Sequence, residues 1–394
     1  MGEEDELDIS MPCCLHLLSA FLAMEPPNVL LSFARDCGGG CITESVQSFI
    51  WKHCISHYDG KLHVPYMKNC LKKLILEVES KGVVLDELYE QYTLYMTSIR
   101  ENDFTKNSRV LKTISFVFPD EYAGLASCPK TRKLEVPLQC SLNMLEGGTG
   151  CCIWPSSLFL SEFILSYPEL FLHKSCVEVG SGAGLVGICL RQVKASKVIL
   201  TDGDLSTLAN MRSNLELNKI SATNDSLDGS LHADKVKCVH LLWEYATEDE
   251  LQSFAPHIVL GADVIYNPSC LPHLVRILGA LLKCRKSLPS FVHDGRECSN
   301  EIASESGLQQ TSSANNNYLN NEVLSNDLNK HPVALIASVI RTKDTFSYFL
   351  SLAEEANLHV MDITEKIKPI SLLPYMKSYE RSNVRMFVVS YLSK

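Results

Sequence analysis

The stretch from Val177 to Gly187 constrains the fold of this chain more than any other. It reads V-E-V-G-S-G-A-G-L-V-G, an apolar strand with a glutamate followed by four glycines among eight positions. Glycines let a ligand approach the backbone closely, and the N-terminus of the helix that follows favours the ligand's polar end. A second apolar run, V-I-L-T-D from Val198 to Asp202, ends on an acid that suits a ribose diol. The pattern predicts a site for a nucleoside-bearing cofactor.

Strand and helix patterns alternate around this stretch. Periodicity predicts strands at 176–180, 197–201, 236–242, 258–262, 333–340, 358–363 and 384–390, with helices at 184–192, 205–218, 271–284 and 345–356. Such alternation is typical of an α/β fold whose mostly parallel sheet is covered on both faces. No helix pattern separates the last two strands, so we expect one of them to enter antiparallel.

The chain divides into three regions by pattern. Residues 1–96 show helical spacing only, and we expect a helical N-terminal module there. Residues 97–145 form a connecting segment with short strands at 109–116 and 132–136. Residues 146–394 carry the α/β pattern, and their Ser-, Asn- and Glu-rich stretch 296–331 is expected to be a disordered insertion that forms a passive surface loop.

Composition narrows the partners and the compartment. The net charge of −10 argues against binding of nucleic acid by bulk electrostatics. Several of the 16 cysteines lie in apolar runs, where a free thiol behaves as a small hydrophobic group. The acidic N-terminus shows no signal peptide, and no apolar run is long enough for a membrane span. We therefore expect a reducing compartment, cytosolic or nuclear, and favour the cytoplasm.

Four further positions stand where ligands would bind. Trp154 follows the glycine-rich run E-G-G-T-G-C-C-I, and Trp243 follows the strand at 236–242; each is expected to line a cofactor pocket, with a core aromatic as the alternative. Asp263 and Tyr266, in G-A-D-V-I-Y-N-P, come directly after the strand at 258–262. The carboxyl ends of parallel strands meet at one edge of the sheet, so these side chains should share a crevice with Asp202.

This combination resembles the seven-β-strand S-adenosylmethionine-dependent methyltransferases. Within them it is similar to the protein-lysine methyltransferases, which share G-G-T-G-x-x-x-W-P before the first core strand and D-x-x-Y after the fourth. The segments Y-M-K-N-C-L-K-K-L-I-L-E-V-E and D-E-L-Y-E-Q-Y resemble the helical module of the elongation factor 2 lysine methyltransferases. The resemblance covers most of the chain, apart from 296–331. It implies a seven-stranded Rossmann-like methyltransferase sheet, mostly parallel, preceded by a small all-α module that recognises the substrate.

The resemblance also implies roles for individual residues. Asp263 and Tyr266 would face the incoming lysine, and Asp202 would hold the ribose of S-adenosylmethionine. Glu178 would orient the methionine end directly or through water. The remaining expected cofactor contacts are Trp154, Gly180, Ser181, Gly182, Trp243 and Ala262.

Elementary chemistry fits this division of labour. Methyl transfer from a sulfonium is an in-line displacement, so alignment of donor and acceptor is the main task. The acceptor must be a neutral amine, and deprotonating a lysine of pKa near 10.4 at pH 7 costs about 4.6 kcal/mol. Neither a metal nor a covalent nucleophile is required. Asp263 is expected to orient the amine, because a carboxylate favours the protonated form and makes a poor base here.

The sequence also permits other interpretations. Cys37, Cys41, His53 and His57 have a spacing close to that of a zinc finger, but the interior spacing is one residue short and we do not expect zinc. An amino-methyltransferase of nucleic acids would want D/N-P-P-Y/F in place of A-D-V-I-Y. A non-catalytic module that has lost its cofactor is a further alternative. We expect a monomer; the sequence leaves the modified lysine and the number of methyl groups open.

Overall fold

The computed structural model describes residues 6–58, 63–98, 109–142, 149–223, 236–283 and 332–392. The expected insertion at 296–331 lies outside these residues, as does 143–148 in the glycine-rich run before Trp154. None of the helices in the described ranges is long and apolar enough to cross a membrane.

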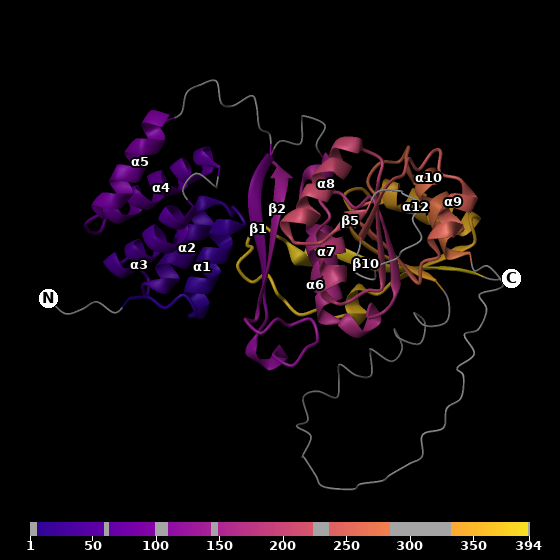
Figure 1. Cartoon of the computed structure of the whole chain (residues 1–394), viewed down its shortest axis with the longest axis horizontal. Coiled ribbons are helices and arrows are strands. Elements are labelled where there is room, and N and C mark those ends of the chain that lie inside the picture. Colours follow the sequence, from indigo (N-terminus) through magenta and orange to yellow (C-terminus); the bar gives the residue numbers. More distant parts are fainter. Residues whose placement is uncertain are drawn as a thin grey trace, which may run out of the picture.

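The N-terminal region is helical throughout its described part and lies at one end of the molecule (Figure 1). Pro12 and Pro27 each stand at the first position of a helix, where a missing N–H costs nothing. The helices are α1 (Pro12–Leu22), α2 (Pro27–Cys37), α3 (Glu44–Phe49), which continues into a π-helical turn at Ile50–Ile55, α4 (Val64–Glu79) and α5 (Asp86–Ser98). The division of the chain into functional domains stays a prediction.

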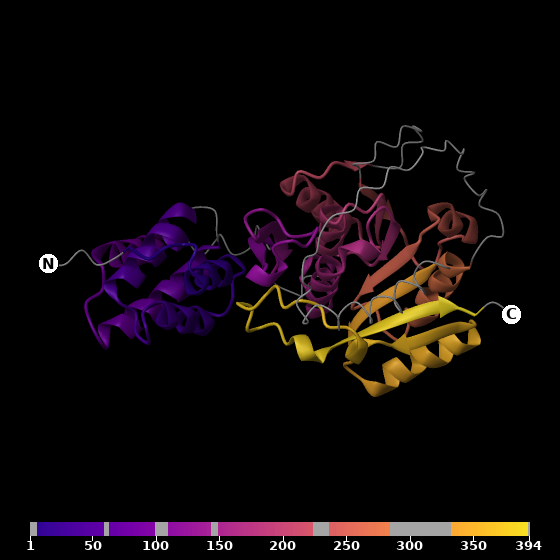
Figure 2. The ribbon, with the colours of Figure 1, turned by 90° about the horizontal axis from the view of Figure 1, so that it is seen from below.

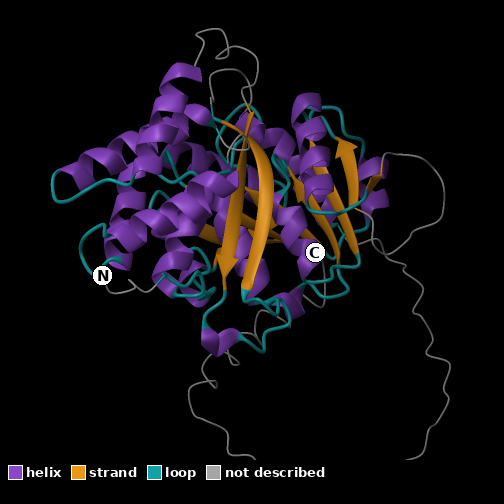
Figure 3. Cartoon of the chain, turned by 60° about the vertical axis from the view of Figure 1, so that its left-hand side comes forward, coloured by secondary structure: helices purple, strands orange, loops and turns teal. Residues whose placement is uncertain are grey.

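An antiparallel hairpin stands between these helices and the main sheet (Figures 1 and 3). It consists of β1 (Arg109–Val117) and β2 (Lys133–Ser141), with Ile114 opposite Val136. The second strand runs five residues beyond the predicted end at Val136, and Pro137 is tolerated within it because a two-stranded ribbon has only edges.

The main sheet confirms the predicted α/β class with a mostly parallel sheet. Its strand order is β5-β6-β4-β3-β7-β8-β10-β9, and β10 alone runs antiparallel to its two neighbours, as expected for one of the last two strands. Seven longer strands match the predicted ones: β3 (Ser175–Val179), β4 (Lys197–Asp202), β6 (Val236–His240), β7 (Ile258–Ala262), β8 (Val333–Val339), β9 (Leu358–Asp362) and β10 (Val384–Tyr391). The eighth, β5 (Ala222–Thr223), is a two-residue edge strand that the sequence did not signal.

Helices cover both faces of this sheet, as the near-continuous apolar strands require. One face packs against α6 (Pro155–Ser166), α7 (Leu185–Gln192) and α8 (Leu205–Leu217). The other packs against α10 (Leu271–Leu282), α12 (Lys343–Glu355) and α9 (Glu248–Phe254), a short helix that periodicity did not predict. Successive strand residues point to opposite faces, so Cys176 joins the first core and Val177 the second.

The connection between β9 and β10 ties the sheet to the hairpin and to the N-terminal helices. Figure 2 shows this segment extending from the sheet toward the N-terminal helices. The hydroxyl of the fully buried Tyr375 accepts a hydrogen bond from the Ser115 amide of β1 at 2.8 Å. The Ser378 amide donates to the carboxylate of Glu25, just after α1, at 2.9 Å. Three regions far apart in sequence therefore share one connecting segment.

A buried carboxylate on α6 also binds the connection between β9 and β10. Glu162 has 0% exposure and accepts hydrogen bonds from the Leu372 amide at 2.7 Å and the Tyr379 hydroxyl at 3.0 Å. The Arg381 guanidinium lies 3.0 Å from it and stacks over Phe159. Desolvation raises the pKa of Glu162, and the pairing with Arg381 opposes that rise.

We expect Glu162→Ala to be strongly destabilising. The change leaves the Tyr379 hydroxyl, the Leu372 amide and the Arg381 guanidinium without the carboxylate that they contact. Removal of one partner from a buried ion pair costs about 3 kcal/mol. Urea unfolding should show that loss in the free energy of unfolding. The control is Glu216→Ala, on the exposed side of α8, which should change it by less than about 0.5 kcal/mol. Equal effects of the two substitutions would contradict the role given to Glu162.

Candidate active site

The glycine run forms a turn that only glycine can make. Gly180 and Gly182 adopt left-handed φ angles of 66° and 54°, which β-carbons disfavour. A Cβ on Gly182 would lie 2.8 Å from the carbonyl oxygen of Gly150, and one on Gly180 would press against Val264. The turn ends at Gly184, where α7 begins. Strand β3 thus delivers the chain to a helix N-terminus with bare backbone along one wall of a cavity.

Asp202 stands at the end of β4, across from this turn. Its carboxylate accepts hydrogen bonds from the amides of Gly182, at 3.1 Å, and Asp204, at 3.0 Å. Desolvation raises the pKa of Asp202, and these backbone donors oppose the rise. Each oxygen keeps a lone pair for a ligand hydroxyl. Asp204 caps α8 as predicted, since its side chain accepts from the Thr207 amide at 2.7 Å.

Both tryptophans line the same cavity. Trp154 precedes α6 and is oriented by a 3.1 Å hydrogen bond from its indole N–H to the Thr149 carbonyl. Trp243 follows β6, and its ring approaches Gly180. Both side chains are partly exposed, so neither is the wholly buried core aromatic that the alternative interpretation required.

The cavity has a volume of about 530 Å³, within the range of small-molecule sites. Polar and charged side chains at or after the ends of β4, β6, β7 and β8 meet there. Of the predicted site residues, the structure brings the following around it: Trp154, Gly180, Gly182, Asp202, Trp243, Ala262, Asp263 and Tyr266. Their individual roles stay predictions.

Ser181 and Glu178 lie behind the cavity wall. The Ser181 hydroxyl accepts from the Thr201 amide at 3.0 Å and donates to the Glu178 carbonyl at 3.2 Å, so it fastens the turn to β4. The Glu178 side chain is 1% exposed, and its Oε2 has no hydrogen-bond partner among the described residues. Desolvation raises the pKa of Glu178 to about 8. A buried carboxyl with an unused oxygen, two residues before Gly180, fits a cationic ligand group reached directly or through water.

Asp263 occupies a strained backbone position in the cavity lining. It adopts a left-handed φ of 59°, uncommon for a residue with a β-carbon, and its amide donates to the Ala337 carbonyl of β8 at 2.8 Å. Tyr266, 59% exposed, stands at the cavity rim. Desolvation, followed by neighbouring negative groups, raises the pKa of the Tyr266 hydroxyl. The two residues predicted to face a lysine therefore line the same cavity, Asp263 buried and Tyr266 exposed at the rim.

Arg341 is the cavity residue that sequence reasoning missed. Its guanidinium contacts Asp263 with both terminal nitrogens, at 2.6 and 3.1 Å, and lies 5.3 Å from the ring centre of Trp154. An arginine shortly after a strand is unremarkable on its own. The available signal was its place shortly after the strand predicted at 333–340, which the structure places next to β7 in the sheet.

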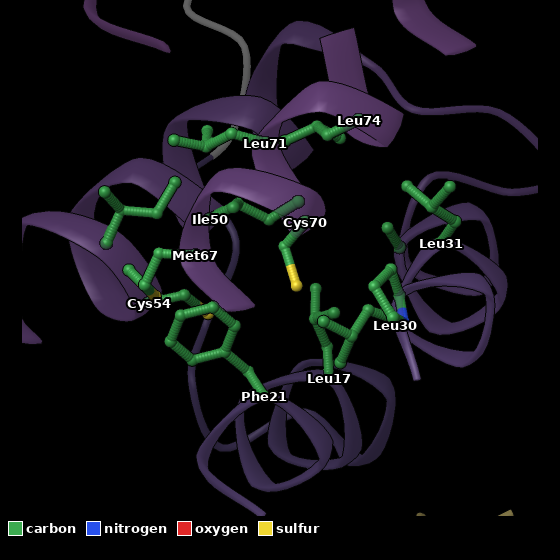
Figure 4. Close-up of a pocket in the computed structure, with 13 residues that line it drawn as sticks. Leu17, Phe21, Leu30, Leu31, Ile50, Cys54, Met67, Cys70, Leu71 and Leu74 are labelled. Carbon is green, nitrogen blue, oxygen red and sulfur yellow. The ribbon is translucent and has the colours of Figure 1, made fainter. Parts of the chain in front are cut away.

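A second cavity lies inside the helical module (Figure 4). Its volume of about 30 Å³ holds about one water molecule, and its lining is apolar, including Leu17, Phe21 and Met67. The Cys70 thiol points into the space, and burial raises its pKa to about 12. This void is a packing defect between helices and is too small for a cofactor.

The zinc-like spacing does not correspond to one site in space. Among the described residues, Cys37 lies with Cys13 and Cys14, whose sulfurs are within 4.8 Å of one another and of its own. Cys41 is exposed, and the His53 ring packs against Phe49 at 4.7 Å between centres. The four residues Cys37, Cys41, His53 and His57 are thus not gathered around a common point.

Comparison with known proteins agrees with this geometry. The sequence model of the family described as lysine methyltransferase matches residues 133–301. Human protein-lysine N-methyltransferase EEF2KMT is 33% identical over 256 residues, which cover 64% of this chain and 71% of the human protein. The mouse protein of that name is also 33% identical and covered to 71%. The chain belongs to the EEF2KMT family of protein-lysine N-methyltransferases.

Two other similar proteins are covered less completely. A putative uncharacterized protein of Dictyostelium discoideum is 32% identical, and the match covers 62% of this chain and 60% of that protein. Human putative protein N-methyltransferase FAM86B1 is covered over 43% of its length. The chain therefore spans less than two thirds of the length of these two relatives. A Bacillus cereus O-methyltransferase structure aligns with a TM-score of 0.32 at 11% identity, over 63% of this chain and 86% of that one.

We expect binding of S-adenosylmethionine to release a proton from Glu178. With its pKa raised to about 8, this carboxyl is mostly protonated at neutral pH, and an arriving cationic group favours ionisation. Affinity should therefore increase as pH rises toward about 8 and then level off. Calorimetric titration near neutral pH, in buffers of different ionisation enthalpy, should give different binding enthalpies.

Glu178→Gln supplies the control, because glutamine keeps the shape and cannot titrate. In that variant the enthalpies in the two buffers should coincide, and the rise of affinity with pH should vanish. A wild-type enthalpy that does not depend on the buffer would contradict the prediction.

Proposed function

We propose that this chain transfers methyl groups from S-adenosylmethionine to a lysine side chain of a protein, and that this protein is elongation factor 2. The observation that supports the proposal most is the meeting of a cofactor-type glycine turn, Asp202 and the pair Asp263–Tyr266 around one cavity. Membership of a family of protein-lysine N-methyltransferases supports it independently. The name EEF2KMT of the human and mouse relatives accords with elongation factor 2.

The cofactor half of the cavity fits the proposed methyl donor. Asp202 would accept from the ribose hydroxyls, the bare backbone at Gly180 and Gly182 would allow close approach, and Trp154 and Trp243 would provide apolar walls. S-adenosylmethionine supplies an electrophilic methyl group on a sulfonium. The partnerless Oε2 of Glu178 supports a cationic group nearby, and the volume of about 530 Å³ is sufficient.

The acceptor half of the cavity would hold the lysine amine in line with the methyl group and the sulfur of the donor. Oδ2 of Asp263 retains a lone pair that can accept from a lysine amine, and Tyr266 stands at the rim where a long side chain would enter. Alignment of the two reactants is the main contribution required of such a site. Partial desolvation in the cavity lowers the pKa of the entering lysine and increases its neutral fraction.

We further propose that the helical module recognises the protein substrate, and that the protein acts in the cytoplasm as a monomer without direct contact to nucleic acid. The net charge of −10 supports the last point. Apolar side chains on α4 and α5 that remain exposed, Leu76 at 57% and Leu94 at 58%, support a docking role for the module.

The proposed reaction is tested by incubating the protein with labelled S-adenosylmethionine and purified elongation factor 2. We expect label on a lysine of the factor, with a mass increase in multiples of one methyl group. Asp263→Ala should lose the transfer because no carboxylate orients the amine, while S-adenosylhomocysteine binds as before. Label found only in RNA would favour a nucleic-acid methyltransferase, and absence of cofactor binding would favour a non-catalytic module.

For the helical module, we expect the double variant Leu76→Ser/Leu94→Ser to raise KM for the protein substrate by about fivefold, or about 1 kcal/mol, with kcat kept. Loss of exposed apolar contact weakens docking without touching the cavity. The matched control is Leu350→Ser/Leu392→Ser, on α12 and after β10, where the leucines are 38% and 54% exposed. Equal KM values for the two double variants would rule out docking through these leucines.

A further inference from the structure

The charges around the cavity are unequal. Its described lining carries the carboxylates of Asp202, Asp204, Glu244 and Asp263, and Arg341 is the only cation in that lining. Such a wall attracts a positively charged lysine, but it also stabilises the protonated amine, which cannot attack a methyl group. An acceptor site of this kind needs a positive charge placed beside the amine.

Arg341 is placed to supply that charge. It follows β8, and its two terminal nitrogens meet the two oxygens of Asp263, whose side chain is only 4% exposed. The planar guanidinium group matches the geometry of the carboxylate and is positively charged. The face of Trp154, on the wall next to the glycine turn, fixes the other side of the guanidinium. Arg341 therefore spans the boundary between the acceptor and cofactor halves of the cavity.

We propose that Arg341 is a positioning residue which keeps Asp263 as a neutral ion pair, so that Asp263 orients the acceptor lysine without stabilising its protonated form. This inference rests on the proposed methyl transfer to lysine and adds the control of the acceptor's protonation. Oδ1 of Asp263 accepts from both Arg341 and the Val339 amide, whereas Oδ2 accepts from Arg341 and keeps a second lone pair, so the pair need not open when the amine arrives.

The remaining groups around Asp263 do not replace Arg341. The Val339 amide of β8 contacts the same carboxylate at 3.4 Å, carries no net charge and cannot titrate. Tyr266 and Cys270, which follow β7, have side chains that cannot carry a positive charge, and the other charged wall residues, Asp202, Asp204 and Glu244, are acids. Loss of Arg341 leaves the amine among acids alone.

The expected signature is a shift of the pH profile. The profile is kcat plotted against pH, measured with both substrates saturating. Its acidic limb, where kcat rises with pH, reports ionisation in the ternary complex, including that of the bound lysine. Arg341→Gln should move this limb upward by at least about one pH unit, a roughly tenfold loss of kcat at pH 7 that shrinks as pH rises. Arg341→Lys keeps the charge and should keep the limb near its wild-type position, at a lower plateau.

A charge-neutral double variant makes the test sharper. Asp263→Asn/Arg341→Gln removes both charges, so its acidic limb should return toward the wild-type pH although its plateau is lower. Arg385→Gln is the matched control: Arg385 pairs with Asp362 on β9, outside the cavity lining, and its side chain is 44% exposed against 43% for Arg341. That variant should leave the profile unchanged.

The outcomes separate the inference from the function on which it rests. Wild-type protein that methylates no lysine would refute the proposed function itself. With active wild-type protein, the inference is overturned if Arg341→Gln lowers kcat by the same factor at every pH, or if the double variant retains the full shift. Thermal unfolding and titration with S-adenosylhomocysteine show whether each variant is folded and binds the cofactor.

Discussion

The buried carboxylate of Glu162 is the constraint on which the arrangement of the whole chain depends. A carboxylate with no exposed surface on an apolar helix must find donors, because an unpaired buried charge costs several kcal/mol. Its donors, from Leu372 to Arg381, all lie in the β9–β10 connection. That connection is therefore held against α6, and through Tyr375 and Ser378 it reaches the hairpin and the N-terminal helices.

The site follows from a second constraint, the common direction of β4, β3, β7 and β8. Parallel strands end at one edge, and side chains placed just after them converge. The same convergence gathers acids, because Asp202 and Asp263 each follow such a strand. The strand topology thus gives the cavity an excess of negative charge. Arg341, which follows β8, neutralises part of this charge through its contact with Asp263.

Periodicity and local turn chemistry predicted most of this fold. The seven longer strands and the capping role of Asp204 could be found because their signals are local, within one strand or one turn. The structure brings together Asp202, Trp243 and Asp263 for a related reason, since each is marked by the strand before it. Short elements such as α9 and β5 are too brief to show a period.

Features that depend on pairing across long distances could not be predicted in this way. Glu162 pairs with Arg381 and Asp263 with Arg341, and no spacing along the chain connects either couple. A glutamate inside the apolar run L-F-L-S-E-F-I-L was a visible sign of a buried charge, but it did not name the partner. The zinc-like spacing shows that a regular spacing need not bring residues together. Cys37 lies beside Cys13 and Cys14, and these two residues are not part of the zinc-like pattern.

Two buried carboxyl groups from the neighbouring strands β3 and β7, Glu178 and Asp263, show how the partner decides the charge. Glu178 and Asp263 are 1% and 7% exposed, so depth does not distinguish them. No cation among the described residues contributes to the pKa of Glu178, and burial raises that pKa to about 8, so the carboxyl stays mostly neutral until a positive group arrives. Asp263 already has Arg341 and needs no ligand to satisfy it. On the cofactor side, Glu178 can thus gain a negative charge when a cationic methyl donor binds. On the acceptor side, Asp263 and Arg341 already form a neutral pair, which suits an amine that must react uncharged.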